Sequence, residues 1–594
     1  MSKRIEDYAL IGDCHTAALV ARDGSIDWLC LPRFDGGACF AALLGTPENG
    51  YWQIAPAEEP RSATRRYRDE TLILETEFET STGRARVVDF MPLRHEYPDL
   101  VRIVEGLEGQ VAMQMRMVLR TDYGSIVPWV RQIDRGINAV AGPDSLRLET
   151  PIHLRGEDLT TLGNFTVDAG QQTPFVLTWY ASHIKPPPSL DAFQALKRTE
   201  RWWHRWAHRC MYDGPHREAV VRSLVTLKAL TYEPTGGIVA AATTSLPERI
   251  GGVRNWDYRY CWVRDATLTL EALLTNGYID EAHAWREWLL RAVAGNPSQM
   301  NIMYGLAGER RLTEIELDWL AGYADSKPVR IGNAAHRQFQ LDVFGELIDA
   351  MHTARAAGHE CDENAWRVET KLAEFLETGW KEPDEGIWEV RGPRRHFTHS
   401  KVMAWVAFDR LIKDAEQFGF EGPVERWRSV RDEIHKEVCK KGFDKKRNTF
   451  VQSYGAPDLD ASLLMIPLVG FLPVSDPRVA GTVEAIEKEL LIDGFVARYR
   501  PKKSVDGLPP GEGAFLACTF WLADNYALLG RRGDAEQLFA RLLELRNDVG
   551  LLAEEYDPHE QRQVGNFPQA FAHVGLINTA WNLGNGCPHR RQHK

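Results

Sequence analysis

Residues 255–265 read Asn-Trp-Asp-Tyr-Arg-Tyr-Cys-Trp-Val-Arg-Asp, and residues 266–274 continue as Ala-Thr-Leu-Thr-Leu-Glu-Ala-Leu-Leu. The second part has the apolar spacing of a helix. The first part gathers aromatic rings, which stack on the apolar faces of a sugar, and arginines and aspartates, which hydrogen-bond its hydroxyls. The stretch indicates a sugar-binding loop at the mouth of a helix. A Trp-rich loop packed under its own charges is the alternative.

Downstream of this loop the helical pattern repeats. Segments with 3.6-residue apolar spacing begin near residues 217, 266, 280, 336, 363, 398, 423, 461, 479, 513, 532 and 568. Every second connection is a long loop rich in Gly, Pro and aromatic residues, and such loops are uncommon in compact domains unless they carry function. This alternation predicts an (α/α)6 barrel, with the long loops and the active site at one end.

Upstream of the loop the chain has the pattern of β structure. Asp23-Gly24-Ser25 lies between two apolar runs and predicts a hairpin. The run 101–119 is predicted as two strands broken at Glu108-Gly109. Further strands are expected within 71–92, 146–154, 159–167 and 174–181. Many short strands separated by turn residues are typical of an antiparallel β-sandwich.

Pro186-Pro187-Pro188 separates the two parts, because neither a central strand nor a helix interior tolerates three prolines. The chain is therefore predicted to be multidomain. Residues 1–188 form the β-sandwich, 189–215 a linker helix and 216–594 the helical catalytic barrel.

The bulk composition restricts the class of protein. The chain has 594 residues, too many for one ordinary core, and its 44% hydrophobic and 26% charged content is that of a globular protein. A net charge of -12 without a long Lys/Arg run argues against a nucleic-acid partner. No apolar signal core or membrane-length apolar run occurs, so no membrane association is expected. Nine scattered cysteines without a CxxC pair indicate the cytoplasm, and a homo-oligomer is compatible with the sequence.

Two of the long loops place a glutamate beside apolar or aromatic residues. Glu389 follows Trp388, and Glu554 follows Leu-Leu-Ala. Glycoside hydrolysis needs one protonated carboxyl to protonate the leaving oxygen and one carboxylate to activate water or attack carbon. We expect Trp388 to raise the pKa of Glu389 by desolvation, and polar neighbours to keep Glu554 ionised. Glu555 is the alternative to Glu554 as the base.

The chain resembles glycoside hydrolase family 15, the glucoamylase and trehalase family, and most of all its intracellular bacterial members. The resemblance covers essentially the whole chain, including residues 8–13 and 23–29, and implies a β-sandwich followed by an (α/α)6 barrel. It implies that Glu389 is the general acid and Glu554 the general base. It also implies sugar-binding roles for the residues that match the family's motifs, namely Tyr258, Trp262, Arg264, Asp265, Trp388, Arg498 and Tyr499.

Some positions depart from that pattern or allow another interpretation. Relatives of the fungal type carry a Trp before the fourth helix, where this chain has residues 324–327, so Trp319 is only an approximate match for a contact to the second sugar. Glu512 is either a substrate contact or an ordinary loop carboxylate. Asp265 could instead cap the helix that follows it. No set of side chains has metal-like spacing, so neither a metal nor a cofactor is expected.

These features favour an inverting, exo-acting α-glucoside hydrolase that releases β-D-glucose from a non-reducing end of a disaccharide or oligosaccharide. The substrate α,α-trehalose is favoured over glucoamylase-like substrates such as starch or isomaltose. A disaccharide phosphorylase is disfavoured by Glu554, and a non-catalytic glucan-binding protein by the carboxylate pair. Inversion predicts that the carboxyl groups of Glu389 and Glu554 lie about 6.5–9.5 Å apart.

Overall fold

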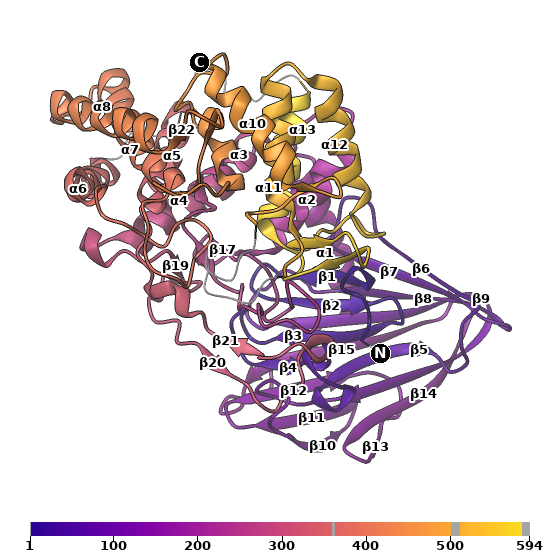
Figure 1. Cartoon of the computed structure of the whole chain (residues 1–594). Coiled ribbons are helices and arrows are strands. Elements are labelled where there is room, and N and C mark those ends of the chain that lie inside the picture. Colours follow the sequence, from indigo (N-terminus) through magenta and orange to yellow (C-terminus); the bar gives the residue numbers. More distant parts are fainter. Residues whose placement is uncertain (1, 359–362, 501–510, 585–594) are drawn as a thin grey trace.

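The computed structural model describes residues 2–358, 363–500 and 511–584. Its N-terminal part is an antiparallel β domain and its C-terminal part is helical (Figure 1). The strands of the β domain are β1 (Tyr8–Gly12), β2 (Ala17–Ala21), β3 (Ser25–Cys30), β4 (Ala38–Phe40), β5 (Tyr51–Pro56), β6 (Ser62–Tyr67), β7 (Leu74–Glu79), β8 (Gly83–Phe90), β9 (Asp99–Val118), β10 (Trp129–Ile133), β11 (Gly136–Ala141), β12 (Asp144–Glu149), β13 (Arg155–Glu157), β14 (Thr160–Asp168) and β15 (Gln172–Ala181).

Strand β9 connects the two layers of the β domain. Its first half pairs with β8 and β15, and its second half pairs with β5 and β14. Side chains alternate across each strand, so the inner faces of both layers contribute to one core that includes Trp52, Val87, Met115 and Leu148. The predicted β-sandwich is confirmed.

The prediction of two strands within 101–119 is wrong, because β9 continues through Gly109 without a break. Gly109 has φ +64, and the register between β8 and β9 shifts between Arg84 and Ala85. A bulge bends a strand without ending it. The turn signal at this glycine therefore marks the passage of β9 from one layer to the other.

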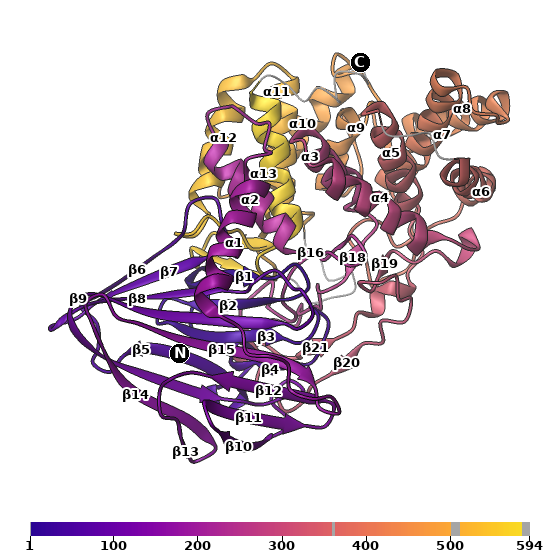
Figure 2. The same ribbon diagram turned by 180° about the vertical axis from the view of Figure 1, so that it is seen from behind.

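Helix α1 (Ala192–Ala207) follows the β domain and lies across it in Figure 2. Asp191 caps its first turn, since Oδ1 accepts hydrogen bonds from two backbone N–H groups at 3.0 Å each. Leu196 packs on the sheet face. On the other side, Trp206 stacks on Tyr278 of the helical part, with ring centroids 4.2 Å apart.

The helical part contains α2 to α13. Their bounds are α2 (Arg217–Ala229), α3 (Ala266–Thr275), α4 (Ile279–Val293), α5 (Asp342–Ala356), α6 (Glu363–Gly379), α7 (Thr398–Phe418), α8 (Val424–Lys441), α9 (Met465–Leu468), α10 (Pro477–Leu490), α11 (Leu516–Leu528), α12 (Arg532–Glu544) and α13 (Ala570–Leu583). The predicted starts agree closely with these bounds, except that α5 and α9 begin after the short turns η6 (Ala334–Arg337) and η7 (Ala461–Leu464). No helix in the described part of the chain is long and apolar enough to cross a membrane.

The helices form two concentric rings. The inner ring is α3, α5, α7, α9, α11 and α13, in which each helix contacts the next and α13 contacts α3. Helices α7 and α11 are buried on nearly all sides, whereas the outer helix α8 buries only a stripe at Trp427, Ile434 and Val438. Apolar residues all round a helix suit an inner position, and an apolar stripe suits an outer one. The predicted (α/α)6 barrel is confirmed.

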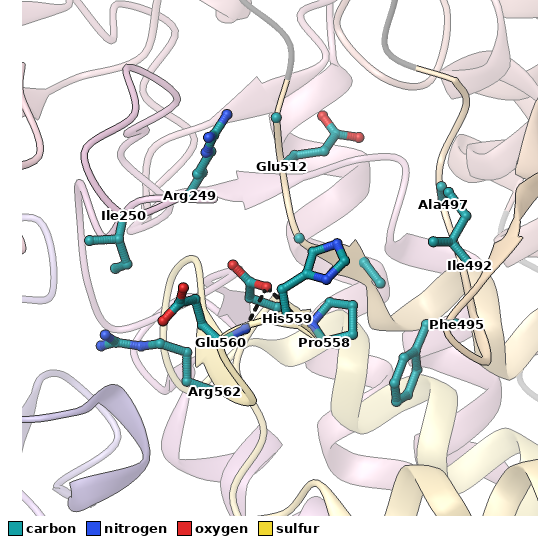
Figure 3. Close-up of a pocket in the computed structure, with 14 residues that line it drawn as sticks. Arg249, Ile250, Ile492, Phe495, Ala497, Glu512, Pro558, His559, Glu560 and Arg562 are labelled. Atoms are coloured by element: carbon teal, nitrogen blue, oxygen red, sulfur yellow. Dashed lines mark hydrogen bonds between the residues drawn. The ribbon is translucent and has the colours of Figure 1, made fainter.

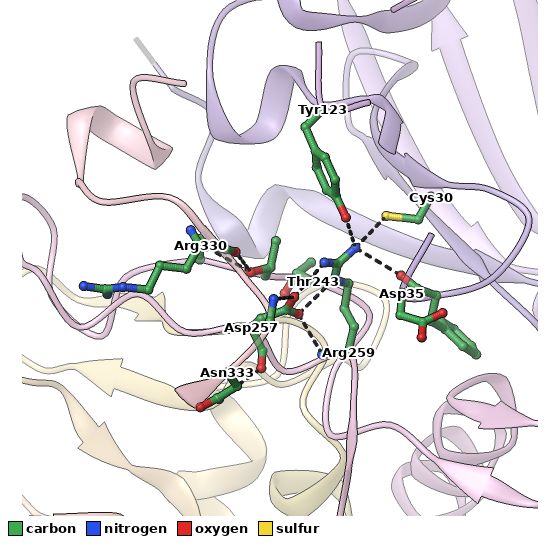
Figure 4. Close-up of polar contacts among 12 residues, drawn as sticks. Cys30, Asp35, Tyr123, Thr243, Asp257, Arg259, Arg330 and Asn333 are labelled. Carbon is green, nitrogen blue, oxygen red and sulfur yellow. Dashed lines mark hydrogen bonds and ion pairs between the residues drawn. The ribbon is translucent and has the colours of Figure 1, made fainter. Parts of the chain in front are cut away.

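A buried ion pair fastens the loop 255–265 to the β domain (Figure 4). The Arg259 guanidinium pairs with Asp257 at 2.6 Å. Its Nη1 reaches across to the backbone oxygens of Phe34 at 3.3 Å and Gly36 at 3.1 Å, and to the Tyr123 hydroxyl at 2.8 Å. The loop that begins the helical ring is therefore positioned by side chains and backbone of the sandwich.

Candidate active site

The end of the loop 255–265 is fixed by a short ladder and by the start of α3. Strand β18 (Cys261–Trp262) pairs with β19 (Met303–Tyr304). Asp265 precedes α3, but its side chain makes no capping hydrogen bond; instead Oδ1 accepts from Arg264 Nε at 2.9 Å. The capping interpretation of Asp265 is therefore wrong, and the largely buried pair offers its remaining polar atoms at the helix mouth.

Glu389 contacts this pair. Its Oε1 accepts hydrogen bonds from Trp262 Nε1 at 2.7 Å and from Arg264 Nη1 at 3.2 Å. The expected apolar setting is wrong, because a guanidinium and an indole N–H hold the carboxyl, while Trp388 donates to Asp460 instead. The backbone of Glu389 has φ +56, a left-handed conformation that non-glycine residues seldom adopt and that concentrates at functional sites.

Glu554 is connected to Glu389 through two aromatic side chains. The Tyr258 hydroxyl donates to Glu554, and the Tyr258 ring packs edge-on against Trp262 with centroids 5.1 Å apart. Trp262 in turn donates to Glu389. Glu554 Oε2 also accepts from the backbone N–H of Asn566 at 3.2 Å, and nothing in the described residues hydrogen-bonds Oε1. That oxygen is available to a water molecule.

The expectation that polar neighbours keep Glu554 ionised is wrong. Burial, and next the negative charge of Glu248, raise the pKa of Glu554 to about 8. The carboxyl is 1% exposed, so little solvent offsets either effect. Glu554 therefore carries a proton at neutral pH for much of the time and ionises as the pH rises through about 8. A pKa near the working pH suits a general base.

Glu248, Glu554 and Glu555 form a buried carboxylate cluster, in which an oxygen of each lies within 4.8 Å of the others. Arg498 Nη2 lies 2.7 Å from Glu248, 2.9 Å from Glu512 and 3.1 Å from Glu555. Among the described residues this is the one group of three such side chains close enough to hold a metal ion. Arg498 already supplies a positive charge there, so we interpret the group as a carboxylate–arginine cluster.

These side chains surround a small cavity formed by the long loops. The predicted residues in its wall are Tyr258, Arg264, Trp388, Glu389 and Arg498. Trp262, Asp265, Glu512 and Glu554 support that wall through the hydrogen bonds and ion pairs described above. The wall also contains residues that the sequence did not single out, namely Glu248, Arg254, Trp256, Arg391 and Phe515. Their nearness in the chain to predicted residues, as Trp256 is to Tyr258 and Arg391 is to Glu389, was the available signal.

Two predicted sugar contacts do not line this cavity. Trp319 is 46% exposed, and its Nε1 donates to the backbone oxygen of Tyr123 in the sandwich at 3.1 Å. Tyr499 is buried and its backbone pairs with Asp460. A match to a family motif does not by itself determine the direction of a side chain.

A larger cavity of about 630 Å³ borders the cluster at Glu512 (Figure 3). Its wall includes Arg249, Phe495, His559 and Arg562. Neither Glu389 nor Glu554 lies in its wall, so the size of this cavity does not identify it as the site of acid–base chemistry.

A β-sandwich before an (α/α)6 barrel, with two buried carboxyl groups and several guanidinium groups around a cavity in the long loops, is suited to cleaving glycosidic bonds. The model of "Glycosyl hydrolases family 15" matches residues 214–581, and the model "Trehalase-like, N-terminal" matches residues 1–179. The chain belongs to glycosyl hydrolases family 15.

Curated relatives are similar over nearly the whole chain. A trehalase of Mycobacterium tuberculosis is 38% identical, with 97% of this chain and 88% of the relative covered. A trehalase of Thermoplasma volcanium is 36% identical, with 98% and 93% covered. Among solved structures, a bacterial glucoamylase complexed with acarbose superposes with a TM-score of 0.73 at 12% identity and covers 100% of this chain and 94% of that one. This last similarity is one of fold.

Proposed function

We propose that the protein is an α,α-trehalase that hydrolyses its substrate with inversion and releases β-D-glucose. The observation that carries this proposal is the similarity to four proteins named trehalase, at 35% to 38% identity over 95% to 98% of the chain. The two connected glutamates, Glu389 and Glu554, supply the acid and the base that hydrolysis requires.

Glu389 is the general acid in this proposal. It enters the reaction protonated and donates its proton to the oxygen between the two glucose units. Arg264 and Trp262 then stabilise the carboxylate that remains, because both donate to Oε1. The same two donors fix the direction of the carboxyl before substrate binds.

Glu554 is the general base. In its ionised form it takes a proton from water, and the water oxygen attacks the anomeric carbon on the face opposite the leaving group. The Tyr258 hydroxyl and the Asn566 N–H orient the carboxylate, leaving Oε1 for that water. Arg264, Asp265 and Arg498 bind the hydroxyls of the glucose that is attacked.

The proposal is tested by measuring glucose release from trehalose, maltose, isomaltose and soluble starch, with the anomer of the product followed by NMR. We expect hydrolysis of trehalose without added phosphate and an equimolar yield of β- and α-glucose before mutarotation. Glucose release from maltose or starch but not from trehalose would refute trehalase activity. A strict need for phosphate, with a glucose phosphate as product, would instead identify a phosphorylase.

We also assign the enzyme to the cytoplasm, where buried free thiols such as Cys14, Cys261 and Cys518 stay reduced. The sequence is compatible with a homo-oligomer, which light scattering on the purified protein would detect.

A further inference from the structure

Arg391 lies in the wall of the catalytic cavity, two residues after Glu389. The backbone between them is held by Gln338, whose Nε2 donates to the backbone oxygen of Glu389 at 3.1 Å and to that of Val390 at 3.3 Å. The backbone from which Arg391 extends is therefore held next to the residue that is proposed to protonate the glycosidic oxygen.

The N–H donors of the Arg391 guanidinium are not used in hydrogen bonds within the described structure, unlike those of Arg264 and Arg498 in the same wall. Arg264 donates to Asp265, Glu389 and a backbone oxygen, and Arg498 contacts three carboxylates. The nearest carboxylate to Arg391 in the described structure is that of Glu314, at 3.8 Å, and no hydrogen bond to Arg391 is formed there. A guanidinium has five N–H donors in a planar fork, so Arg391 presents unused donors to the cavity.

An aromatic ring holds this guanidinium in place. The Arg391 guanidinium carbon lies 4.7 Å from the centroid of the Trp256 ring, which also lines the cavity. Arg330 lies 4.6 Å from the same centroid, and its own guanidinium is occupied by backbone oxygens of the loop and by Glu316. The Trp256 ring thus makes cation–π contacts with both guanidinium groups and positions that of Arg391.

The position of Arg391 determines which sugar it can reach. Glu389 acts on the oxygen that joins the two sugars, and Arg264, Asp265 and Arg498 are assigned to the attacked glucose. A cavity residue just beyond Glu389 whose donors are unused then belongs to the other side of the scissile bond. We propose that Arg391, positioned by Trp256, binds hydroxyls of the second, departing glucose unit; the inference rests on the hydrolase function proposed above.

The test compares two substrates that share the attacked glucose but differ in the leaving group. The leaving group of trehalose is a glucose unit. The leaving group of α-glucosyl fluoride is fluoride, so that substrate has no second sugar. We expect Arg391→Ala to lower kcat/KM for trehalose about 10- to 100-fold, the loss typical of a charge-assisted hydrogen bond, and to change kcat/KM for the fluoride by no more than about twofold. Trp256→Leu should lower the trehalose value in the same selective way, and Trp256→Phe should restore most of it.

Arg394→Ala is the matched control, because Arg394 is on the same loop but pairs with Glu385 at 2.9 Å and does not line the cavity. It should leave both substrates unaffected. Equal losses on trehalose and fluoride in Arg391→Ala, or no loss on either, would overturn the inference. A wild-type enzyme that cleaves the fluoride and maltose but not trehalose would refute the trehalase proposal instead, and the same comparison on maltose would still decide the role of Arg391.

Discussion

Replacing Glu248 by glutamine removes one negative charge beside Glu554 while keeping the shape of the side chain. After burial, that charge is the largest cause of the raised pKa of Glu554, about 8. A carboxyl with a raised pKa ionises only as the pH rises through that value, so removing the neighbouring charge lowers the pH at which the base becomes active. The acid limb of kcat/KM against pH should therefore move to lower pH, because it reports the ionisation of the base in the free enzyme.

The size of the shift follows from the distance between the carboxylates. Their oxygens lie within 4.8 Å, and two unit charges at that separation repel by about 3.5 kcal/mol at an effective dielectric constant of about 20. One pKa unit corresponds to about 1.36 kcal/mol, so a fully charged Glu248 would account for about 2.5 units. Burial also raises the pKa of Glu248, and neighbouring carboxyl groups titrate as a coupled pair, so the observed shift is smaller than this figure. The expected shift is about one to two pH units.

The assay is the pH dependence of kcat/KM on trehalose for the wild type, Glu248→Gln and Glu512→Gln. Glu512 is the matched control, because it also pairs with Arg498 but is not among the charges that most raise the pKa of Glu554. We expect its removal to move the acid limb less. An acid limb that stays in place in Glu248→Gln, or moves to higher pH, would show that Glu248 does not control the base.

Three further predictions concern the acid, the sugar clamp and the domain contact. Glu389→Ala should lose far more activity on trehalose than on α-glucosyl fluoride, whose leaving group needs no proton; similar losses on both would contradict its role as the acid. Asp265→Ala leaves the Nε donor of the buried Arg264 without its carboxylate and should lower kcat/KM about 100-fold or more in a variant that circular dichroism shows to be folded; near-normal activity would make the pair structural. Arg259→Ala strands the buried Asp257 carboxylate and should reduce the free energy of unfolding by about 3–5 kcal/mol, measured by urea denaturation; an unchanged midpoint would contradict the assigned role of the pair.

Much of the fold could be predicted from the sequence because the helices keep a strong period. Helix α3 begins at Ala266, as its apolar spacing predicts, and long loops follow every outer helix of the ring. Strand β9 was less predictable, since Gly109 gives the same signal for a turn and for a bulge. Only its pairing partners on both sides show that the strand continues.

The site was predictable where its residues are neighbours in a motif, as Arg264 and Asp265 are. It was not predictable where distant loops meet. The pKa of Glu554 depends on Glu248, which comes from a loop at the other end of the barrel sequence. The setting of Glu389 depends likewise on donors from another loop rather than on the adjacent Trp388. Sequence identifies these side chains, but only packing brings their charges together.

The contact of Arg259 with the backbone of Phe34 and Gly36 has a consequence for how this gene can change. A recombinant protein that joins the sandwich of one relative to the helical ring of another would disturb this contact between the two domains, which is made by a fully buried guanidinium. Backbone oxygens cannot be substituted away, but the loop that carries them can shift in shape. We therefore expect such a recombinant to lose stability unless residues 34–36 and Arg259 come from the same relative.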